Sequence, residues 1–314
     1  MKKFTSVSDA EDLQALVKRA LEIKKDPLGM CELGKNKTML LIFFNNSLRT
    51  RLSTQKAALN LGMNVIVFDI NEGGWKLETE MGVIMDGDKP EHLREAVPVI
   101  GSFCDIIGVR SFASLSNKEK DYNEVILSQF VRYAGVPVVS LESATLHPLQ
   151  SLADIITIEE HKIKDKPKIV MSWAPHPRAL PQAVPNSFAE WVLAKGYDLT
   201  ITHPVGYELS DNYTKGAKVE HDQMKAFENA DFVYAKNWSS FNRYGDILST
   251  DRDWTVSDRQ MAKTNDAKFM HCLPVRRNMI VSDSVIDGKN SLVIPEAANR
   301  LYSAQAVIET ILKN

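Results

Sequence analysis

Short apolar runs alternate with amphipathic helical patterns along the whole chain of 314 residues. Runs this short predict buried strands, and the segments between them predict helices. Regular alternation of the two is typical of parallel sheets whose strands are joined by crossover helices. The sequence therefore predicts an α/β fold with two doubly wound parallel-sheet domains joined by helices. The predicted strands are Met39–Phe44, Asn64–Asp69, Asp105–Val109, Pro137–Ser140, Lys168–Ser172, Asp198–Thr202, Phe232–Ala235, Lys268–His271 and Ser291–Ile294. The predicted helices between them are Arg49–Leu61, Glu91–Ser102, Tyr122–Tyr133, Leu149–His161 and Phe188–Ala194.

The predicted elements divide into two halves along the chain. A helical segment from Pro148 to His161 joins the halves, and the last amphipathic segment, Ala298–Leu312, is expected to cross back onto the first half. We therefore expect one domain at residues 1–147 plus 298–314 and a second domain at residues 148–297.

Composition restricts the possible partners and the compartment. The net charge is −2 without a long run of Lys or Arg, which argues against nucleic acid and against an anionic membrane as partners. No stretch approaches the roughly 18 apolar residues that a membrane span needs. The cysteines, Cys31, Cys104 and Cys272, include no C-x-x-C pair, which favours a reducing compartment. The N-terminus does not resemble a signal or transit peptide, so we expect a cytoplasmic protein.

The segment Ser47-Leu48-Arg49-Thr50-Arg51 lies between the first long apolar run and a predicted helix. Unpaired backbone N–H groups and the helix dipole favour an anion at a helix N-terminus. The guanidinium groups of Arg49 and Arg51 add positive charge, and a guanidinium matches phosphate oxygens in a bidentate way. The alternative is an ordinary first turn in which Ser47 serves as the helix cap.

Polar and ionisable residues also follow most of the other predicted strands. In open α/β sheets, ligands bind beyond the carboxyl ends of the strands, so these residues are expected to meet at one edge of each sheet. The segments concerned are Arg110-Ser111, Glu142, His147–Gln150, Trp173–Arg178, Lys236 and His271–Pro274.

The motifs S-x-R-T-R at Ser47–Arg51, H-P-x-Q at His147–Gln150 and H-C-L-P at His271–Pro274 carry a resemblance. In their order and spacing over essentially the full length, the chain resembles the aspartate and ornithine carbamoyltransferase family. The resemblance implies one domain for carbamoyl phosphate and one for the amine substrate. It also implies a homotrimer whose active sites are shared between subunits.

The same resemblance implies roles for individual residues. Ser47, Leu48, Arg49 and Thr50 would hold the phosphate. Arg110 would bridge the phosphate and the carbonyl oxygen, His147 would donate to that oxygen, and Gln150 would bind the carbamoyl amino group. Arg110, His147 and Cys272 are the residues expected to take part in catalysis. The full set expected to bind carbamoyl phosphate is Ser47, Leu48, Arg49, Thr50, Trp75, Arg110, His147, Gln150, Cys272, Leu273 and Arg300.

The chemistry of carbamoyl transfer agrees with these residue types. An amine attacks the carbamoyl carbon, negative charge develops on the carbonyl oxygen, and phosphate leaves. Thr50, Arg110 and His147 would form an oxyanion hole for that charge. None of the seven histidines has the H-x-x-x-H spacing of a metal site, and we expect neither a metal nor another cofactor.

The amine substrate is indicated by departures from the ornithine enzymes. No Ser-Met-Gly turn occurs in the chain, and the corresponding region reads Lys236-Asn237-Trp238-Ser239-Ser240. The proline-rich segment Pro175–Ser187, which we expect to be a stiff loop, resembles that of the N-acylornithine branch. By this resemblance Glu142, His176, Lys236 and Leu273 would contact an N-acylornithine.

The acyl group is expected to be succinyl. By resemblance, Pro90 occupies a loop position where the acetyl-specific branch carries glutamate, which would fill space and repel a second carboxylate. A one-residue shift would place Glu91 there instead, so N-acetylornithine stays as the alternative acceptor. The predicted reaction gives N-succinylcitrulline and phosphate in arginine biosynthesis.

The sequence argues against two other classes of protein. A nicotinamide-dependent dehydrogenase is disfavoured because no G-x-G-x-x-G follows a strand with an acidic residue about 20 positions later. A non-catalytic anion-binding paralogue is the second rival. It would be expected to lack donors for the oxyanion, whereas Thr50, Arg110, His147 and Gln150 are all present.

Overall fold

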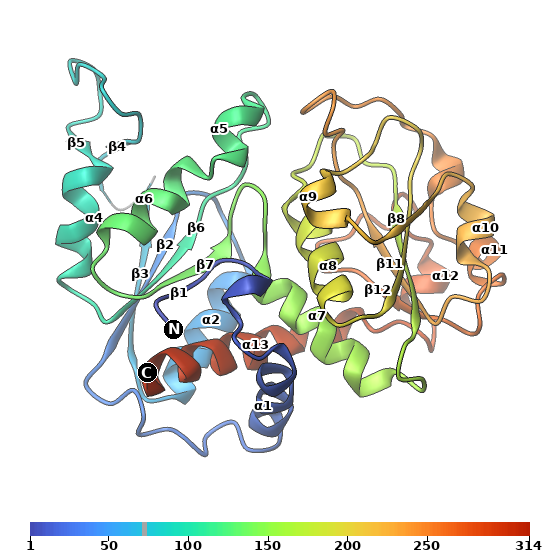
Figure 1. The fold of residues 1–314 in the computed structure, drawn as a ribbon, viewed down its shortest axis with the longest axis horizontal. Coiled ribbons are helices and arrows are strands. Elements are labelled where there is room, and N and C mark those ends of the chain that lie inside the picture. Colours follow the sequence, from blue (N-terminus) through green and yellow to red (C-terminus); the bar gives the residue numbers. More distant parts are fainter. Residues whose placement is uncertain (71–73) are drawn as a thin grey trace. The chain divides into compact units, whose positions relative to one another are not determined.

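A computed structural model describes residues 1–70 and 74–314 of the chain (Figure 1). The chain forms two compact units. Unit 1 contains Met1–Ser114, Lys118–Leu149 and Arg300–Asn314, and unit 2 contains Leu115–Asn117 and Gln150–Asn299. Each unit is built on a five-stranded sheet with helices around it. The predicted α/β fold with two parallel-sheet domains is therefore confirmed.

The sheet of unit 1 has the order β1-β7-β6-β2-β3, and every neighbouring pair in it is parallel. Its middle strands are almost entirely buried, as expected when helices cover both faces. One face packs its apolar side chains against two helices, α4 and α6. The strands are β1 (Lys3–Phe4), β2 (Thr38–Phe43), β3 (Asn64–Asp69), β6 (Ile106–Arg110) and β7 (Val138–Glu142). The other elements are η1 (Val7–Asp9), α1 (Leu13–Lys25), α2 (Arg49–Asn60), the ribbon of β4 (Leu77–Glu78) and β5 (Glu91–His92), α4 (Leu93–Gly101), α5 (Lys118–Tyr122), α6 (Val125–Tyr133) and α13 (Val293–Lys313) from Arg300 onward.

The sheet of unit 2 has the order β10-β9-β8-β11-β12 and is also parallel throughout. A buried cluster that includes Val170, Val233 and Phe269 packs the middle strands against the following helices. The strands are β8 (Lys168–Trp173), β9 (Asp198–Thr202), β10 (Lys218–Glu220), β11 (Phe232–Lys236) and β12 (Lys268–Met270). The helices are α7 (Pro148–His161), α8 (Ala183–Ala194), α9 (Asp211–Thr214), α10 (Gln223–Phe227), η2 (Arg252–Trp254), α11 (Asp258–Met261), α12 (Asp283–Ile286) and the start of α13.

One predicted strand is wrong. Ser291–Ile294 forms a single bridge from Ser291 to Phe269, and helix α13 begins at Val293. The buried residues Leu292 and Val293 anchor the start of that helix, so the short apolar run belongs to a helix N-terminus.

The proline-rich loop is also shorter than predicted. Helix α8 begins at Ala183, so Pro185 lies in its first turn and only Pro175, Pro177 and Pro181 belong to the loop. Proline is tolerated in a first turn because the backbone N–H that it lacks has no partner within the helix there.

Among the helices of residues 1–70 and 74–314, none combines the length and the apolar character that crossing a membrane requires.

Candidate active site

Polar side chains gather at the carboxyl ends of three neighbouring strands in unit 1. Strands β7, β6 and β2 lie side by side in the sheet. Glu142 ends β7, Arg110 ends β6, and the segment Ser47–Arg51 follows β2. Because parallel strands end at the same edge, this order brings residues from three distant parts of the sequence together.

Two arginines meet at the hydroxyl of Thr50, which is buried in the first turn of α2. Arg110 donates from Nη1 to Thr50 Oγ1 at 3.1 Å, and Arg300 donates from Nη2 to the same oxygen. The concentration of positive charge around one small side chain is suited to holding an anion such as phosphate.

Glu142 and His147 extend this group of buried side chains. Arg110 Nη1 lies 2.8 Å from Glu142 Oε2, and His147 Nε2 lies 3.4 Å from the same oxygen. The Arg110 guanidinium also lies 4.3 Å from the centre of the Phe112 ring. The ion pair offsets the cost of burying the arginine, and the stacking contact fixes its plane.

The start of α2 is not closed by a side-chain cap. Leu48 occupies the N-cap position and makes no capping hydrogen bond, so the alternative reading of Ser47 as an ordinary helix cap is wrong. The guanidinium of Arg51 is directed elsewhere, since it donates to Asp69 at 3.3 Å and lies 4.8 Å from the Phe43 ring.

Trp75 and Pro90 lie near the small β4–β5 ribbon of unit 1. The Trp75 side chain is 61% exposed, and its indole N–H donates to Glu91 Oε2 at 2.8 Å. Pro90 is exposed beside this contact. The carboxylate of Glu91 is thus engaged by Trp75.

A second group of polar residues lies at the carboxyl ends of β8, β11 and β12 in unit 2, which are also neighbours in their sheet. Lys236 ends β11, and the His271–Pro274 segment follows β12. In this segment His271 Nδ1 accepts a hydrogen bond from the Leu273 N–H at 2.9 Å. Leu273 has φ 51°, and the Leu273–Pro274 peptide is cis. A leucine with positive φ is strained, and such strain is typical of functional segments.

His176 lies in a cluster of cations. Its Nε2 accepts from Arg276 Nε at 3.1 Å, and its Nδ1 lies 2.9 Å from the Arg178 carbonyl oxygen. Burial lowers the pKa of the imidazole, while the hydrogen bond to the backbone of Arg178 raises it. The charges of Arg276, Lys236 and Arg178 lower the same pKa further. The neutral imidazole thus holds the Arg276 guanidinium in a group of cations that is suited to binding carboxylates.

Sequence reasoning missed Arg276 in this cluster, and it included Arg178 in the segment after β8 without giving it a role. Arg276 stands two residues after the H-C-L-P motif. The available signal was their position beyond the ends of neighbouring strands.

The proline-rich loop is held against the segment after β11. Gln182 Nε2, at the end of the loop, donates to the Ser239 carbonyl at 2.8 Å. The Ser239 N–H in turn donates to the Leu180 carbonyl at 2.9 Å. These bonds fix the loop before any ligand binds, which reduces the entropy cost of binding.

The structure divides the predicted site residues between the units. In unit 1 it brings together Thr50, Arg110, Glu142, His147 and Arg300, at the start of α2 that also carries Ser47, Leu48 and Arg49. In unit 2 it places Lys236 with His176, and Gln150 and the buried Cys272 lie in the same unit.

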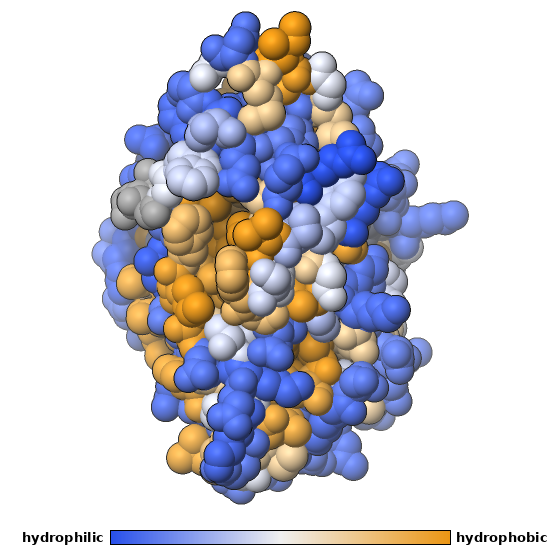
Figure 2. Space-filling model, turned by 90° about the vertical axis from the view of Figure 1, so that its left-hand side faces the viewer, coloured by the Kyte–Doolittle hydropathy of each residue, from blue (hydrophilic) through white to orange (hydrophobic). Residues whose placement is uncertain are grey.

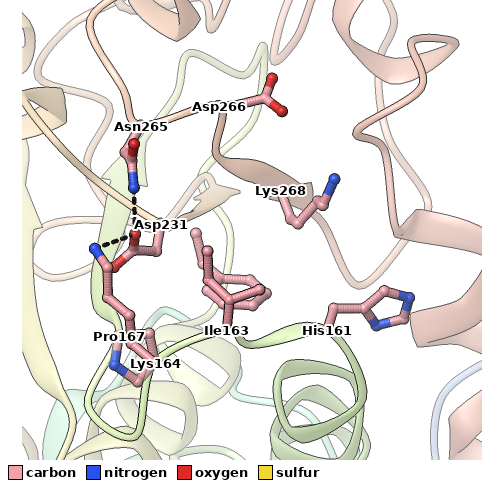
Figure 3. A pocket seen from close by; sticks show the side chains of 9 residues that line it. His161, Ile163, Lys164, Pro167, Asp231, Asn265, Asp266 and Lys268 are labelled. Carbon is pink, nitrogen blue, oxygen red and sulfur yellow. Dashed lines mark hydrogen bonds and ion pairs between the residues drawn. The ribbon is translucent and has the colours of Figure 1, made fainter.

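Among the described residues, no three His, Cys, Asp or Glu side chains are arranged to hold a metal ion. A cavity of about 320 Å³ lies at the other edge of the unit 2 sheet, where β8, β11 and β12 begin (Figure 3). There Asp231 accepts from Lys164 at 2.7 Å and from Asn265 at 3.0 Å. Because these charges pair with one another, we assign no ligand to this cavity.

Two family models match the chain. The first, described as aspartate/ornithine carbamoyltransferase, carbamoyl-P binding domain, matches residues 2–160. The second, described as aspartate/ornithine carbamoyltransferase, Asp/Orn binding domain, matches residues 182–311.

Curated relatives match over the full length. The N-succinylornithine carbamoyltransferase of Bacteroides fragilis is 67% identical over 316 residues, covering 100% of this chain and 99% of the relative. The protein of the same name from Bacteroides thetaiotaomicron is 66% identical, with the same coverage. The N-acetylornithine carbamoyltransferase of Xanthomonas campestris is 35% identical, covering 99% of this chain and 98% of the relative.

The fold is also similar to those of solved transcarbamylase structures. Acetylornithine transcarbamylase complexed with acetylcitrulline has a TM-score of 0.94 at 34% identity, with 99% of both chains covered. A glutamate-to-proline variant of N-acetyl-L-ornithine transcarbamylase, complexed with carbamyl phosphate and N-succinyl-L-norvaline, has a TM-score of 0.93 at 34% identity. That match covers 99% of this chain and 100% of the other.

Proposed function

The chain belongs to the aspartate/ornithine carbamoyltransferase family, and we propose that it transfers the carbamoyl group of carbamoyl phosphate to the δ-amine of N-succinylornithine. The products are N-succinylcitrulline and phosphate, and the reaction belongs to arginine biosynthesis. The observation that carries the proposed acceptor is the 66–67% identity, over the whole chain, to two N-succinylornithine carbamoyltransferases. The N-acetylornithine enzymes are much more distant, at 35–36%.

In this proposal the unit 1 residues bind the donor substrate. The backbone N–H groups at the uncapped start of α2 and the Arg49 guanidinium hold the phosphate. Arg110 and Arg300, which both donate to Thr50, supply the remaining positive charge around it. Leaving-group charge on the phosphate is stabilised by the same groups.

Carbonyl activation is assigned to Thr50, Arg110 and His147. They are buried, and Arg110 and His147 are both held by Glu142, so their donors are oriented before the substrate arrives. Preorganised donors stabilise the oxyanion without reorganisation as the amine attacks. Gln150 receives the carbamoyl amino group, and Cys272 and the Leu273 carbonyl contact the reacting centre.

The acceptor is assigned to the cationic cluster of unit 2. N-succinylornithine carries two carboxylates, and the cations near His176 are Lys236, Arg178 and Arg276. Lys236 is assigned to the α-carboxylate, as the family resemblance implies. Pro90 removes the negative charge that a glutamate would present to the succinyl carboxylate. Glu142 orients the attacking δ-ammonium before it loses a proton.

We also propose that the protein is a homotrimer with shared active sites. Figure 2 shows apolar side chains gathered on the face of the molecule toward which α4 lies. Ile66 of edge strand β3, Val99 of helix α4 and Phe103 just after α4 are 48%, 53% and 70% exposed. Trp75 lines a cavity of about 260 Å³ between elements of this face, together with Phe68 and Val99. An exposed apolar edge of this kind is suited to a second copy of the chain.

A cytoplasmic location completes the proposal. All three cysteines are free, which is the usual state of thiols in a reducing compartment.

The function is tested with radiolabelled carbamoyl phosphate and three acceptors offered separately: ornithine, N-acetylornithine and N-succinylornithine. We expect labelled N-succinylcitrulline and little product from the other two. A preference for N-acetylornithine would establish the alternative acceptor. Binding of carbamoyl phosphate without transfer to any acceptor would identify a non-catalytic paralogue.

A further inference from the structure

Beneath the H-C-L-P segment, unit 2 contains a cluster of ionisable side chains that the proposed reaction leaves unexplained. Asp154 from α7, Tyr234 from β11 and Glu296 from α13 are fully buried, with 0% of each exposed. Gln150, one turn before Asp154 on α7, is also fully buried. Two carboxyl groups at such a depth carry a large desolvation cost, which a protein sustains only where their contacts compensate.

The two carboxyl groups each hold a residue that contacts substrate in the proposed function. Asp154 Oδ1 accepts from Gln150 Nε2 at 2.8 Å. Glu296 Oε2 accepts from the His271 N–H at 2.8 Å, at the start of the segment that carries Cys272 and Leu273. Gln150 Oε1 is buried and accepts no hydrogen bond from the residues that the structure describes.

The carboxyl groups of Glu296 and Asp154 also interact with each other. Glu296 Oε1 is buried and receives no N–H donor from residues 1–70 and 74–314, and the carboxyl groups of Glu296 and Asp154 lie within hydrogen-bonding reach of each other. A hydrogen bond between two carboxyl groups requires a proton on one of them. Burial raises the pKa of Glu296 well above its usual value, and the negative charges of Asp154 and Cys272 raise it further.

Tyr234 and Cys272 face this pair from other elements, and the His271 N–H donates to Glu296. The Tyr234 ring stacks on Phe188 with centroids 4.0 Å apart. Burial raises the pKa of Tyr234, so its hydroxyl stays neutral.

We propose that Asp154 and Glu296 are positioning residues that share one proton and together fix Gln150 and the His271–Leu273 segment around the carbamoyl group. The inference rests on the proposed function, because it concerns the carbamoyl half of carbamoyl phosphate. Because Gln150 Nε2 donates to Asp154, the amide is oriented with its carbonyl oxygen, which accepts nothing from the described residues, available to accept from the carbamoyl NH₂. The pair thus makes Gln150 an acceptor that recognises the amino group.

A single proton shared by Asp154 and Glu296 can be tested with variants in which a carboxyl group is replaced by an amide of the same shape. In Asp154→Asn, the new amide N–H₂ donates to Glu296 while its oxygen still accepts from Gln150. In Glu296→Gln, the new amide N–H₂ donates to Asp154 while its oxygen still accepts from His271. In the double variant, the bonds from Gln150 and from the His271 N–H can both be kept only if the two new N–H₂ groups face each other. Because two donors repel, one of these two bonds is lost.

The measurement compares affinity for carbamoyl phosphate with affinity for inorganic phosphate, by calorimetry and by steady-state kinetics, in the full-length protein. Each single variant is expected to keep carbamoyl phosphate affinity within about threefold of the wild type, whereas the double variant loses about tenfold or more. Phosphate affinity in all three should change less than about threefold, because phosphate has no amino group for Gln150. Tyr197→Phe, which removes a hydrogen bond to Glu159 elsewhere in unit 2, controls for general loss of stability.

Three results would overturn the inference. One is a double variant as competent as the singles, and another is a single variant as impaired as the double. The third is an equal loss of phosphate and carbamoyl phosphate affinity, which would indicate general damage. A wild type that binds carbamoyl phosphate but carbamoylates no acceptor would instead refute the proposed function, and the binding comparison would still decide the inference.

Discussion

Arg49 and Arg51 stand two positions apart in the first turn of α2, and residues so spaced project from different sides of a helix. Arg51 pairs with Asp69 and packs on Phe43, which ties the start of α2 to strands β2 and β3. The proposed function assigns the charge of Arg49, and not that of Arg51, to the phosphate, as the family resemblance implies.

Arg49→Ala should cripple the binding of carbamoyl phosphate. A buried dianion would lose a charge-assisted partner worth about 1.5–3 kcal/mol, which corresponds to a rise of roughly 10- to 150-fold in its KM. Steady-state kinetics with carbamoyl phosphate as the varied substrate measures this, and the KM for N-succinylornithine should change little. Arg51→Ala is the matched comparison, and we expect it to affect stability more than KM. Equal effects on KM in the two variants would contradict the assignment.

Pro90→Glu should reverse the acceptor preference. A glutamate there would fill space beside the acyl group and repel a second carboxylate, so turnover of N-succinylornithine should fall and that of N-acetylornithine should rise. The ratio of kcat/KM for the two acceptors is the quantity to measure. Glu91→Gln, which removes a negative charge from the same loop, tests whether any change of charge there alters the preference. An unchanged ratio in Pro90→Glu would remove Pro90 from the specificity argument.

Many residues of the candidate site could be found from the sequence because they directly follow apolar runs. Arg110, Glu142 and Lys236 are of this kind. Asp154 and Glu296 could not be found in this way, since they are 142 positions apart on helices and meet only when α7 and α13 fold against the same sheet. A carboxylate on an amphipathic helix is usually on its solvated face, and only tertiary structure shows that these two are buried.

At the scale of elements, the main strands were predictable because strands covered by helices on both faces read as continuous apolar runs. Strand β10 was missed because its residues, Lys218–Glu220, are largely exposed and carry no such run. Strand β1 was missed because it has two residues, too few for any pattern. Ser291–Ile294 was misassigned because a buried helix start has the same apolar character as a short strand.

Glu124 connects helix α6 to the turn before the H-P-x-Q motif. Its carboxylate accepts from the Ser143 hydroxyl at 2.6 Å, from the Thr145 N–H at 2.8 Å and from the Ala144 N–H at 3.2 Å. Burial raises the pKa of Glu124, and these hydrogen bonds act against that rise. The turn that they hold leads directly into His147.

Glu124→Gln should therefore damage both stability and catalysis. One carboxylate oxygen becomes an N–H₂ group that faces backbone donors, and the loss should be about 1–3 kcal/mol of unfolding free energy. We expect a lower melting temperature and a lower kcat, because His147 loses its fixed position. Glu119→Gln changes an exposed carboxylate in the preceding helix α5 and should alter neither quantity. If the melting temperature falls and kcat does not, the turn held by Glu124 does not position His147 for catalysis.

At the scale of the whole molecule, the apolar face at β3 and α4 lies next to residues assigned to substrate binding. Trp75 is exposed on unit 1 and lines the cavity of that face. Large aromatic side chains are costly to leave in water, and they are enriched where proteins meet. A neighbouring subunit would cover this surface and could receive Trp75 in its own site, as the family resemblance implies.

Shared active sites predict that two inactive variants will rescue each other. Trp75→Ala should spoil the site to which the chain donates its tryptophan, and Arg49→Ala should spoil the chain's own phosphate site. In mixed trimers some sites receive Arg49 from one chain and Trp75 from the next, and random assembly makes about a quarter of all sites intact in this way. The two proteins are dissociated, mixed and reassembled, and carbamoyl transfer is then measured alongside mass by light scattering. If the sample contains mixed trimers but is no more active than the average of the two variants, Trp75 belongs to the active site of its own chain.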